Sequence, residues 1–331
     1  MTSRPLTFVV GTGRCGSTAL SGVLRLHPDI LSVNELFAAL APTALPEQPL
    51  DGAQFWSMLA EPRAFATRMI RCGVPLPEFL YPACAGRFSA EDGGIPAIAL
   101  MTLPHLTDDP DALYDALAPR LAARPTGPVA GHYRALFDAL AERCGGRAVV
   151  ERSGYSLRSV PDLHRAFPEA RFVHLFRNGP DCALSMSRHP GFRLIQLMRD
   201  AAGDGAEGLP AELARLAAGA EQDPRVLLEL RQPVADFGGL WSDTVLEGLA
   251  HLDAVPAGLR TSLAYEDLVG DPRRELVRLA AHVGVDPLPQ WLDAAARHLD
   301  GRRGGGANRL PAAERAALYA SCAPGTKALA A

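Results

Sequence analysis

Residues 11–18, Gly-Thr-Gly-Arg-Cys-Gly-Ser-Thr, are the part of the chain best suited to chemistry. They follow an apolar run, Leu6–Val10, and precede a helical pattern that extends from about Ser17 to Leu26. A glycine-rich turn between a strand and a helix directs several backbone N–H groups and the positive end of the helix dipole at one point. Phosphate is the usual ligand of such a turn. We therefore expect an anion-binding loop here, and residues 11–18 are called the phosphate loop below.

Two motif interpretations of the phosphate loop compete. In the first, the pattern G-x-G-x-x-G that starts at Gly11 is a dinucleotide fingerprint, and Glu35, which follows a strand-like Ile30–Val33, is the acidic residue expected about 20 positions later. In the second, the loop is a P-loop in which Ser17 stands where nucleotide triphosphatases have lysine. That absence argues against ATP or GTP hydrolysis. A glycine-rich turn that binds nothing is the remaining alternative.

Together with the residues after it, from Arg14 through His27-Pro28-Asp29 to Glu35, the loop resembles the family of sulfotransferases that use 3′-phosphoadenosine 5′-phosphosulfate (PAPS). The resemblance is closest to the branch that contains tyrosylprotein and bacterial carbohydrate sulfotransferases. Later segments are similar to the family's EKSP strand end, its 3′-phosphate segment and its YEDL element, and the matching elements span residues 6–286. In that order, the three segments are Val149–Gly154, Phe167–Ser185 and Leu263–Leu268 with Asp271-Pro272.

The resemblance implies a cofactor, PAPS, with PAP as its product and no metal. It also implies which residues bind the cofactor, although each has an ordinary alternative: helix capping for Ser17, exposure to solvent for Arg14, a surface ion pair for Arg177, or a place in the core for Tyr265. Arg177 and Ser185 are eight residues apart across an expected strand-to-helix turn, a spacing that lets both reach one phosphate. The implied cofactor-binding residues are Gly13, Arg14, Cys15, Gly16, Ser17, Thr18, Arg177, Ser185 and Tyr265.

Glu35 and Arg14 are the catalytic residues that the resemblance implies. Glu35 would be the general base for the acceptor hydroxyl, with support of a helix cap or surface exposure as the alternative. Arg14 would stabilise negative charge on the transferring group. Cytosolic aryl and steroid sulfotransferases have a histidine base just after the pair that matches Arg152-Ser153, but Gly154 occupies that position here. The missing histidine strengthens the assignment of Glu35.

Four short apolar runs are typical of buried strands, and helical patterns separate them, which predicts an α/β fold with a central, mainly parallel sheet flanked by helices. The resemblance makes this the P-loop-NTPase-like sulfotransferase fold, one domain over residues 1–331. Two stretches fit the alternation poorly, and we expect them to be helical insertions that form the acceptor pocket, at about 42–128 and 190–240. The expected strands are Leu6–Val10, Arg147–Glu151, Arg171–Phe176 and Arg260–Tyr265.

Composition limits the partners of the chain. A formal net charge of −4 over 331 residues gives no reason to expect nucleic acid or a sulfated polysaccharide, so we expect a small-molecule hydroxyl acceptor, such as a natural product or sugar. Six scattered cysteines and the lack of roughly 18 consecutive apolar residues predict a cytoplasmic protein without membrane or metal. A homo-oligomer is compatible with the sequence. A nicotinamide- or flavin-dependent oxidoreductase and a non-catalytic nucleotide-binding module are the rival functions.

Overall fold

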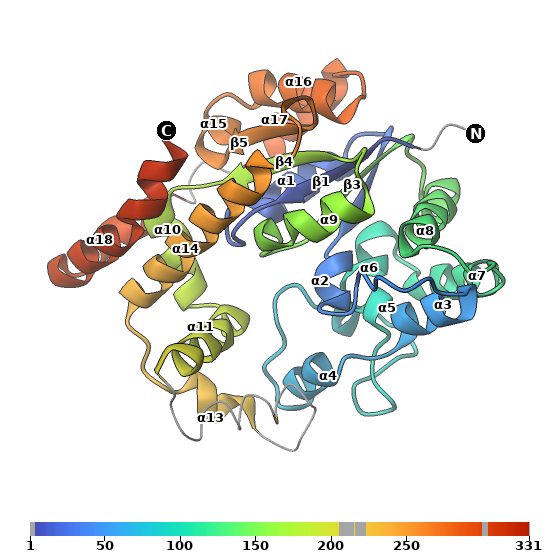
Figure 1. The fold of residues 1–331 in the computed structure, drawn as a ribbon, viewed down its shortest axis with the longest axis horizontal. Coiled ribbons are helices and arrows are strands. Elements are labelled where there is room, and N and C mark those ends of the chain that lie inside the picture. Colours follow the sequence, from blue (N-terminus) through green and yellow to red (C-terminus); the bar gives the residue numbers. More distant parts are fainter. Residues whose placement is uncertain (1–3, 205–214, 216–222, 300–303, 331) are drawn as a thin grey trace.

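A five-stranded parallel sheet forms the centre of the computed structural model, which describes residues 4–204, 215, 223–299 and 304–330 (Figure 1). The strand order is β2-β3-β1-β4-β5, and all four neighbouring pairs are parallel. The strands are β1 (Leu6–Val10), β2 (Ile30–Asn34), β3 (Ala148–Arg152), β4 (Arg171–Phe176) and β5 (Arg260–Ala264).

Both faces of the sheet are buried from β1 to β4, which explains why apolar residues in these strands do not simply alternate with polar ones. The edge strand β5 is only partly buried. Successive side chains of a strand point to opposite faces. In β1, Phe8 and Val10 therefore enter one hydrophobic cluster, together with Phe172 of β4. Val9 enters a second cluster on the opposite face, together with Val173. The predicted fold class, an α/β fold of the P-loop type with a parallel sheet between helices, is confirmed.

Helices connect all the strands. Between β1 and β2 lies α1 (Ser17–Arg25), and between β3 and β4 lie η2 (Leu157–Ser159) and α9 (Val160–Ala166). Between β2 and β3 lie α2 (Leu36–Leu40), α3 (Gly52–Ala60), α4 (Ala64–Arg71), η1 (Tyr81–Ala83), α5 (Ala97–Met101), α6 (Leu103–Leu106), α7 (Pro110–Ala122) and α8 (Val129–Cys144). Between β4 and β5 lie α10 (Gly179–Ser187), α11 (Pro190–Asp204), α13 (Pro224–Leu228), α14 (Val234–Asp253) and η3 (Ala257–Leu259). After β5 come α15 (Tyr265–Gly270), α16 (Pro272–Val283), α17 (Pro289–His298), η5 (Gly306–Arg309) and α18 (Ala312–Leu329).

The expected strands agree with the structure to within one residue at each end. β3 begins and ends one residue later than predicted, so Arg152 is its last residue. β5 ends at Ala264, because Tyr265 is already the first residue of α15. The strand-like run near Ile30 is β2, at the edge of the sheet.

The sheet order argues against the dinucleotide interpretation. In dinucleotide-binding folds the strand that carries the acidic residue lies next to the strand before the glycine-rich loop. Here β3 lies between β2 and β1, so Glu35 at the end of β2 is separated from the phosphate loop by a strand. Glu35 has the sequence spacing of the fingerprint's acidic residue, but the strand order places it one strand too far from the phosphate loop. It is therefore in the wrong place to act as the acidic residue of a dinucleotide site.

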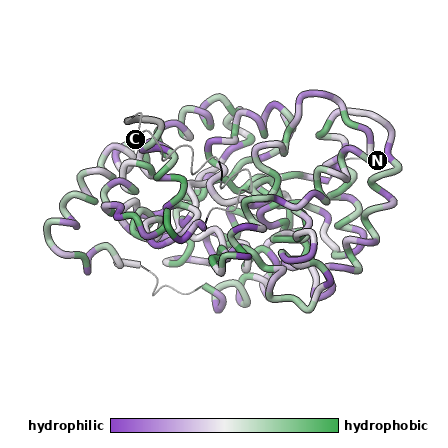
Figure 2. Tube along the Cα trace, turned by 90° about the horizontal axis from the view of Figure 1, so that it is seen from below, coloured by the Kyte–Doolittle hydropathy of each residue, from purple (hydrophilic) through white to green (hydrophobic). Residues whose placement is uncertain are grey.

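The first expected insertion contains the helices from α3 to α7, joined by loops, and it packs into the cluster that contains Phe8. Its function as an acceptor pocket, the second insertion at 190–240 and the single-domain organisation stay predictions. Among the residues that the structure describes, no helix has the length and apolar character needed to cross a membrane. Hydrophilic segments interrupt the hydrophobic ones along the chain in Figure 2.

Candidate active site

A cleft of about 330 Å³ lies at the carboxyl ends of the strands, where open parallel sheets bind ligands. The phosphate loop follows β1, Glu35 follows β2, Arg177 follows β4 and Tyr265 follows β5. Every site residue predicted from the sequence except Cys15 lines this cleft. The full lining is Gly13, Arg14, Gly16, Ser17, Thr18, Ala19, Glu35, Glu78, Arg152, Gly154, Arg177, Asp181, Leu184, Ser185, Arg188, Phe192, Tyr265 and Gly306.

The backbone of the phosphate loop turns through left-handed conformations at Gly13, Arg14 and Gly16, with φ of 74°, 57° and 95°. Gly16 is the N-cap of α1, and no side chain caps the helix, so the alternative that Ser17 merely caps the helix is wrong. Uncapped amides in the first turn leave this helix end ready to bind an anion.

Cys15 differs from the other loop residues because its side chain is buried in the core rather than in the cleft. Burial raises the pKa of its thiol to about 11, so it remains protonated at neutral pH. Only the backbone of Cys15 can therefore contribute to an anion site.

Tyr265 packs directly on the phosphate loop. A Cβ at Gly16 would lie 2.2 Å from Cδ2 of the ring, and the Arg177 Cζ lies 5.0 Å from the ring centroid. The phenol ring is thus held between the loop and the guanidinium, which are brought together from the ends of β1 and β4. Nη2 of Arg177 also lies 3.9 Å from Oδ2 of Asp181, in the first turn of α10, and Ser185 lies one turn further along the helix.

This packing predicts a selective effect of Gly16→Ala. The new methyl group meets the buried ring, so we expect a loss of about 1–3 kcal/mol in the free energy of unfolding beyond the cost of the left-handed backbone. Gly73→Ala is the matched control, since Gly73 has φ of 70° and a Cβ added there would meet no atom within 4 Å. Denaturant unfolding of both variants measures the difference. Equal losses would show that Tyr265 does not restrict position 16.

A second loop reaches the cleft through Asp181. The carboxylate accepts hydrogen bonds from the backbone N–H groups of Gly305 (2.7 Å) and Ala307 (3.0 Å), and this places Gly306 in the cleft wall. Asn308 accepts a hydrogen bond from Tyr319, which ties the same loop to α18. Two basic residues that precede this loop, Arg302 and Arg303, lie outside the described residues.

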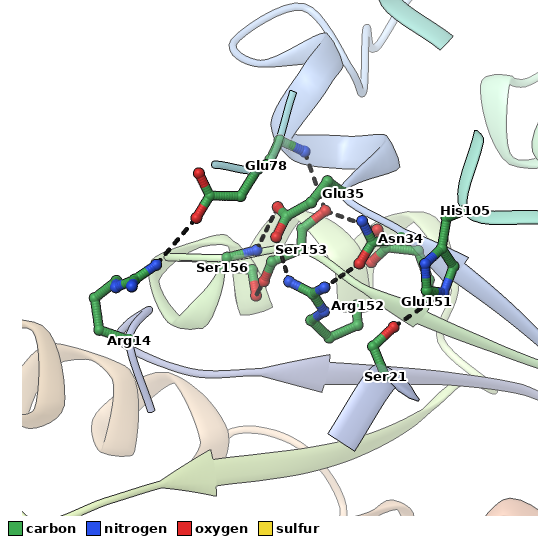
Figure 3. Close-up of polar contacts among 12 residues, drawn as sticks. Arg14, Ser21, Asn34, Glu35, Glu78, His105, Glu151, Arg152, Ser153 and Ser156 are labelled. Carbon is green, nitrogen blue, oxygen red and sulfur yellow. Dashed lines mark hydrogen bonds and ion pairs between the residues drawn. The ribbon is translucent and has the colours of Figure 1, made fainter. Parts of the chain in front are cut away.

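Glu35 lies deep in the cleft, with its side chain only 5% exposed. Its carboxylate forms an ion pair with the equally buried Arg152 and accepts a hydrogen bond of 2.7 Å from the backbone N–H of Gly154 (Figure 3). Arg152 also donates to the side-chain oxygen of Asn34. The alternative that Glu35 is exposed on the surface is therefore wrong.

Two opposing effects act on the pKa of Glu35. Burial raises it, whereas the positive charge of Arg152 and the N–H of Gly154 lower it, and the net shift is upward. A carboxylate whose pKa is raised toward neutrality is a stronger base than an exposed one. The site can therefore accept a proton from a ligand bound in the cleft.

Another buried glutamate, Glu151, precedes Arg152 on β3. Burial raises the pKa of its carboxyl to about 8, so it is largely protonated at neutral pH. Ser153 donates a hydrogen bond of 2.7 Å to it and accepts one of 3.1 Å from the N–H of Ala38 in α2. Glu151 does not line the cleft and supports the end of β3 from the core side.

Arg14 extends from the phosphate loop across the cleft. Its Nε donates to the hydroxyl of Ser185 (3.1 Å), and its Nη1 donates to the carboxylate of Glu78 (3.1 Å). Among the described residues that line the cleft there are four cations and three carboxylates. The cations are Arg14, Arg152, Arg177 and Arg188, and the carboxylates are Glu35, Glu78 and Asp181.

Sequence reasoning missed Glu78, Asp181 and Phe192. The position of Asp181 in the sequence could have indicated it, since an acidic residue in the first turn of a helix commonly accepts backbone hydrogen bonds. No pattern in the sequence indicates Glu78, because it lies in the first insertion and matches no motif. In the described part of the chain, no cluster of three or more His, Cys, Asp or Glu side chains is arranged to hold a metal ion.

Comparison with known proteins identifies one family. A model of the sulfotransferase family matches residues 120–290, which is just over half of the chain. A search of curated protein sequences gave no match.

Several solved structures are similar to this chain. The sulfotransferase domain from the curacin biosynthetic pathway is 16% identical over 92% of this chain and 82% of its own, with a TM-score of 0.49. The sulfotransferase domain of the Synechococcus PCC 7002 olefin synthase is 18% identical over 100% and 96%, with a TM-score of 0.48. A sulfotransferase from Alicyclobacillus acidocaldarius is 17% identical over 99% and 95%, with a TM-score of 0.43.

Proposed function

Because the chain belongs to the sulfotransferase family, we propose that it transfers a sulfuryl group from PAPS to a hydroxyl of a small-molecule acceptor. One observation carries the proposal. A glycine-rich anion loop, two further groups suited to phosphate (Arg177 and Ser185) and a buried carboxylate (Glu35) line the same cleft, although they are far apart in the sequence. Anion binding and proton acceptance at one place are what this reaction requires.

The residues present fit the donor. Gly13 and Gly16 bring the backbone close to the cleft, and the uncapped first turn of α1 offers N–H groups, so this end suits the 5′-phosphosulfate. Arg177 and Ser185 suit the 3′-phosphate, and Tyr265 suits the adenine. PAPS supplies an activated sulfuryl group on a phosphate leaving group.

Glu35 has the properties needed to activate the acceptor. As the acceptor oxygen forms its bond to sulfur and the bond from sulfur to the phosphate oxygen breaks, the hydroxyl proton passes to the Glu35 carboxylate. Arg14, which lines the same cleft, would neutralise charge on the transferring group once the donor is bound. Arg152 holds Glu35 in place, and its positive charge opposes the rise in the Glu35 pKa that burial causes.

The proposed acceptor is a small hydroxyl compound, such as a natural product or a sugar. We further propose that the reaction takes place in the cytoplasm and uses no metal ion. A non-catalytic nucleotide-binding module is the rival that shares the donor site, and it would bind PAP without turnover on any acceptor. An oxidoreductase would instead bind NADH.

Calorimetric titration with PAP tests the donor site. We expect micromolar binding that weakens roughly 10- to 100-fold in Arg177→Ala, because a charge-assisted hydrogen bond contributes about 1.5–3 kcal/mol. Arg165→Ala is the control, since that arginine is exposed on α9 and does not line the cleft. NADH and Mg·ATP are titrated beside PAP. Heat from NADH with none from PAP would mean that the sulfotransferase assignment is wrong.

A further inference from the structure

Among the described residues that line the cleft, Glu78 is the one carboxylate that comes from the first insertion. It lies between α4 and η1, and the two residues that follow it are held in place by packing and a backbone hydrogen bond. Phe79 is buried in the cluster on that face of the sheet, and the N–H of Leu80 donates a hydrogen bond of 3.0 Å to the carbonyl of Leu100 in α5. The position of Glu78 in the cleft wall is therefore set by the packing of the insertion.

The Glu78 carboxylate has two partners. In Figure 3 one carboxylate oxygen of Glu78 faces the guanidinium of Arg14. That oxygen accepts a hydrogen bond of 3.1 Å from Nη1 of Arg14, and the other oxygen lies 3.0 Å from Nε2 of His189. Burial raises the pKa of Glu78, but the hydrogen bond and charge of His189, together with the charge of Arg14, outweigh it and lower the pKa. The carboxylate is therefore ionised at neutral pH.

The neighbouring carboxylates are engaged elsewhere. Glu35 is paired with Arg152, and Asp181 accepts two backbone hydrogen bonds from residues 305–307. Glu78 is thus the carboxylate that contacts Arg14. The other contact of that guanidinium is to a neutral group, the Ser185 hydroxyl.

We infer that Glu78 is a positioning residue that holds Arg14 away from the phosphate loop until an anionic group of the donor replaces its carboxylate. The inference rests on the proposed function, because it takes the replacing anion to be the phosphosulfate end of PAPS or the 5′-phosphate of PAP.

The exchange follows from the geometry. The guanidinium of Arg14 now lies between α10 and the insertion, and a phosphate bound at the loop competes with Glu78 for it. When Arg14 leaves, Glu78 keeps His189 as its partner. The step therefore leaves no unpaired, half-buried carboxylate in the cleft, a state that would oppose donor binding.

The Arg14–Glu78 pair is half-buried, with side-chain exposures of 29% and 23%, so breaking it costs donor affinity. Glu78→Gln keeps the size of the side chain and a hydrogen bond to His189, but it lacks the charge that holds Arg14. We expect PAP to bind about fivefold more tightly to this variant, the gain from releasing one partly exposed ion pair. A purely structural ion pair would give unchanged or weaker binding when it is removed.

The experiment is a calorimetric titration with PAP of the wild type, Glu78→Gln and Glu61→Gln at one ionic strength. Glu61 is an exposed carboxylate of the same insertion and does not line the cleft, so its variant controls for the change in net charge. Thermal unfolding checks that each variant is folded. If Glu78→Gln does not fold, Glu78→Asp withdraws the carboxylate by one methylene group and should give a smaller gain in the same direction.

A double-mutant cycle separates positioning from simple charge repulsion. In an Arg14→Ala background Glu78 has no arginine to hold, so we expect Glu78→Gln to change PAP affinity less than about twofold there, within the usual limits of additivity. A full fivefold gain in that background would show that Glu78 acts only through its charge, and would overturn the inference.

The outcomes also separate the two proposals. If the wild type binds PAP and Glu78→Gln binds it no more tightly, the donor site stands and the role of Glu78 is wrong. If the wild type does not bind PAP, the proposed function is wrong and the role of Glu78 falls with it.

Discussion

Replacing Glu35 by Gln is expected to lower kcat by about 10²–10⁴-fold, the usual contribution of a positioned general base, while changing the affinity for PAP less than about threefold. Gln keeps the size of the side chain and an oxygen for the N–H of Gly154, but it cannot take the acceptor proton. A sulfation assay with PAPS and a panel of hydroxyl acceptors measures kcat, and PAP titration measures binding.

Glu151→Gln is the matched control for this variant. It also removes a buried glutamate beside Arg152, but the pKa of Glu151, raised to about 8, leaves that side chain largely uncharged at neutral pH. We expect near wild-type kcat. Full turnover in Glu35→Gln, or an equal loss in both variants, would show that Glu35 is not the base.

The pH dependence of kcat/KM gives an independent test of the same residue. The base acts when ionised, and burial raises the pKa of Glu35, so the rate should rise with pH through a pKa above the ordinary range of glutamate and then level off. The acidic limb should be missing from the residual activity of Glu35→Gln.

Arg152→Ala is expected to destabilise the fold by about 3–5 kcal/mol, because it leaves the buried Glu35 carboxylate without its cation. Arg158→Ala is the control: its ion pair with Glu247 is about 40% exposed on both sides, and we expect its removal to cost less than about 1 kcal/mol. Denaturant unfolding at pH 7 measures both.

Two further measurements identify the cause. Adding Glu35→Gln to Arg152→Ala should restore part of the stability, because the unpaired charge is removed. The deficit of the single variant should also shrink as the pH falls, since a group whose pKa is raised in the folded state stabilises it at low pH and loses that contribution as pH rises. A deficit that is independent of pH and unchanged in the double variant would assign the effect to lost packing of the arginine.

The fold was predictable where local patterns decide it. Leu6–Val10 and Arg171–Phe176 are strands with the expected bounds, because apolar runs followed by turn residues leave few alternatives. Most site residues were predictable for a related reason. Parallel strands end at the same edge of a sheet, so motifs that each follow a strand converge there.

The remaining contacts depend on neighbours that are distant in the sequence. The pair of Glu35 and Arg152 exists because β2 lies beside β3, and sheet order is not encoded in either strand. Glu78 reaches Arg14 through the packing of the first insertion, which has no periodic pattern that relates it to the phosphate loop. Both contacts are set by tertiary structure, where local sequence carries little information.

All four cations that line the described cleft are arginines, and the chain contains a single lysine, Lys327, in the last turn of α18. A guanidinium does not release its proton at any pH at which the protein is folded. None of these residues can therefore serve as a general acid. In the proposed reaction, the phosphate leaving group would then depart as an anion that is stabilised by charge without being protonated by them. A decline in rate at alkaline pH would accordingly have to arise from the acceptor or from another part of the chain. Reagents that modify lysine should leave the cleft untouched.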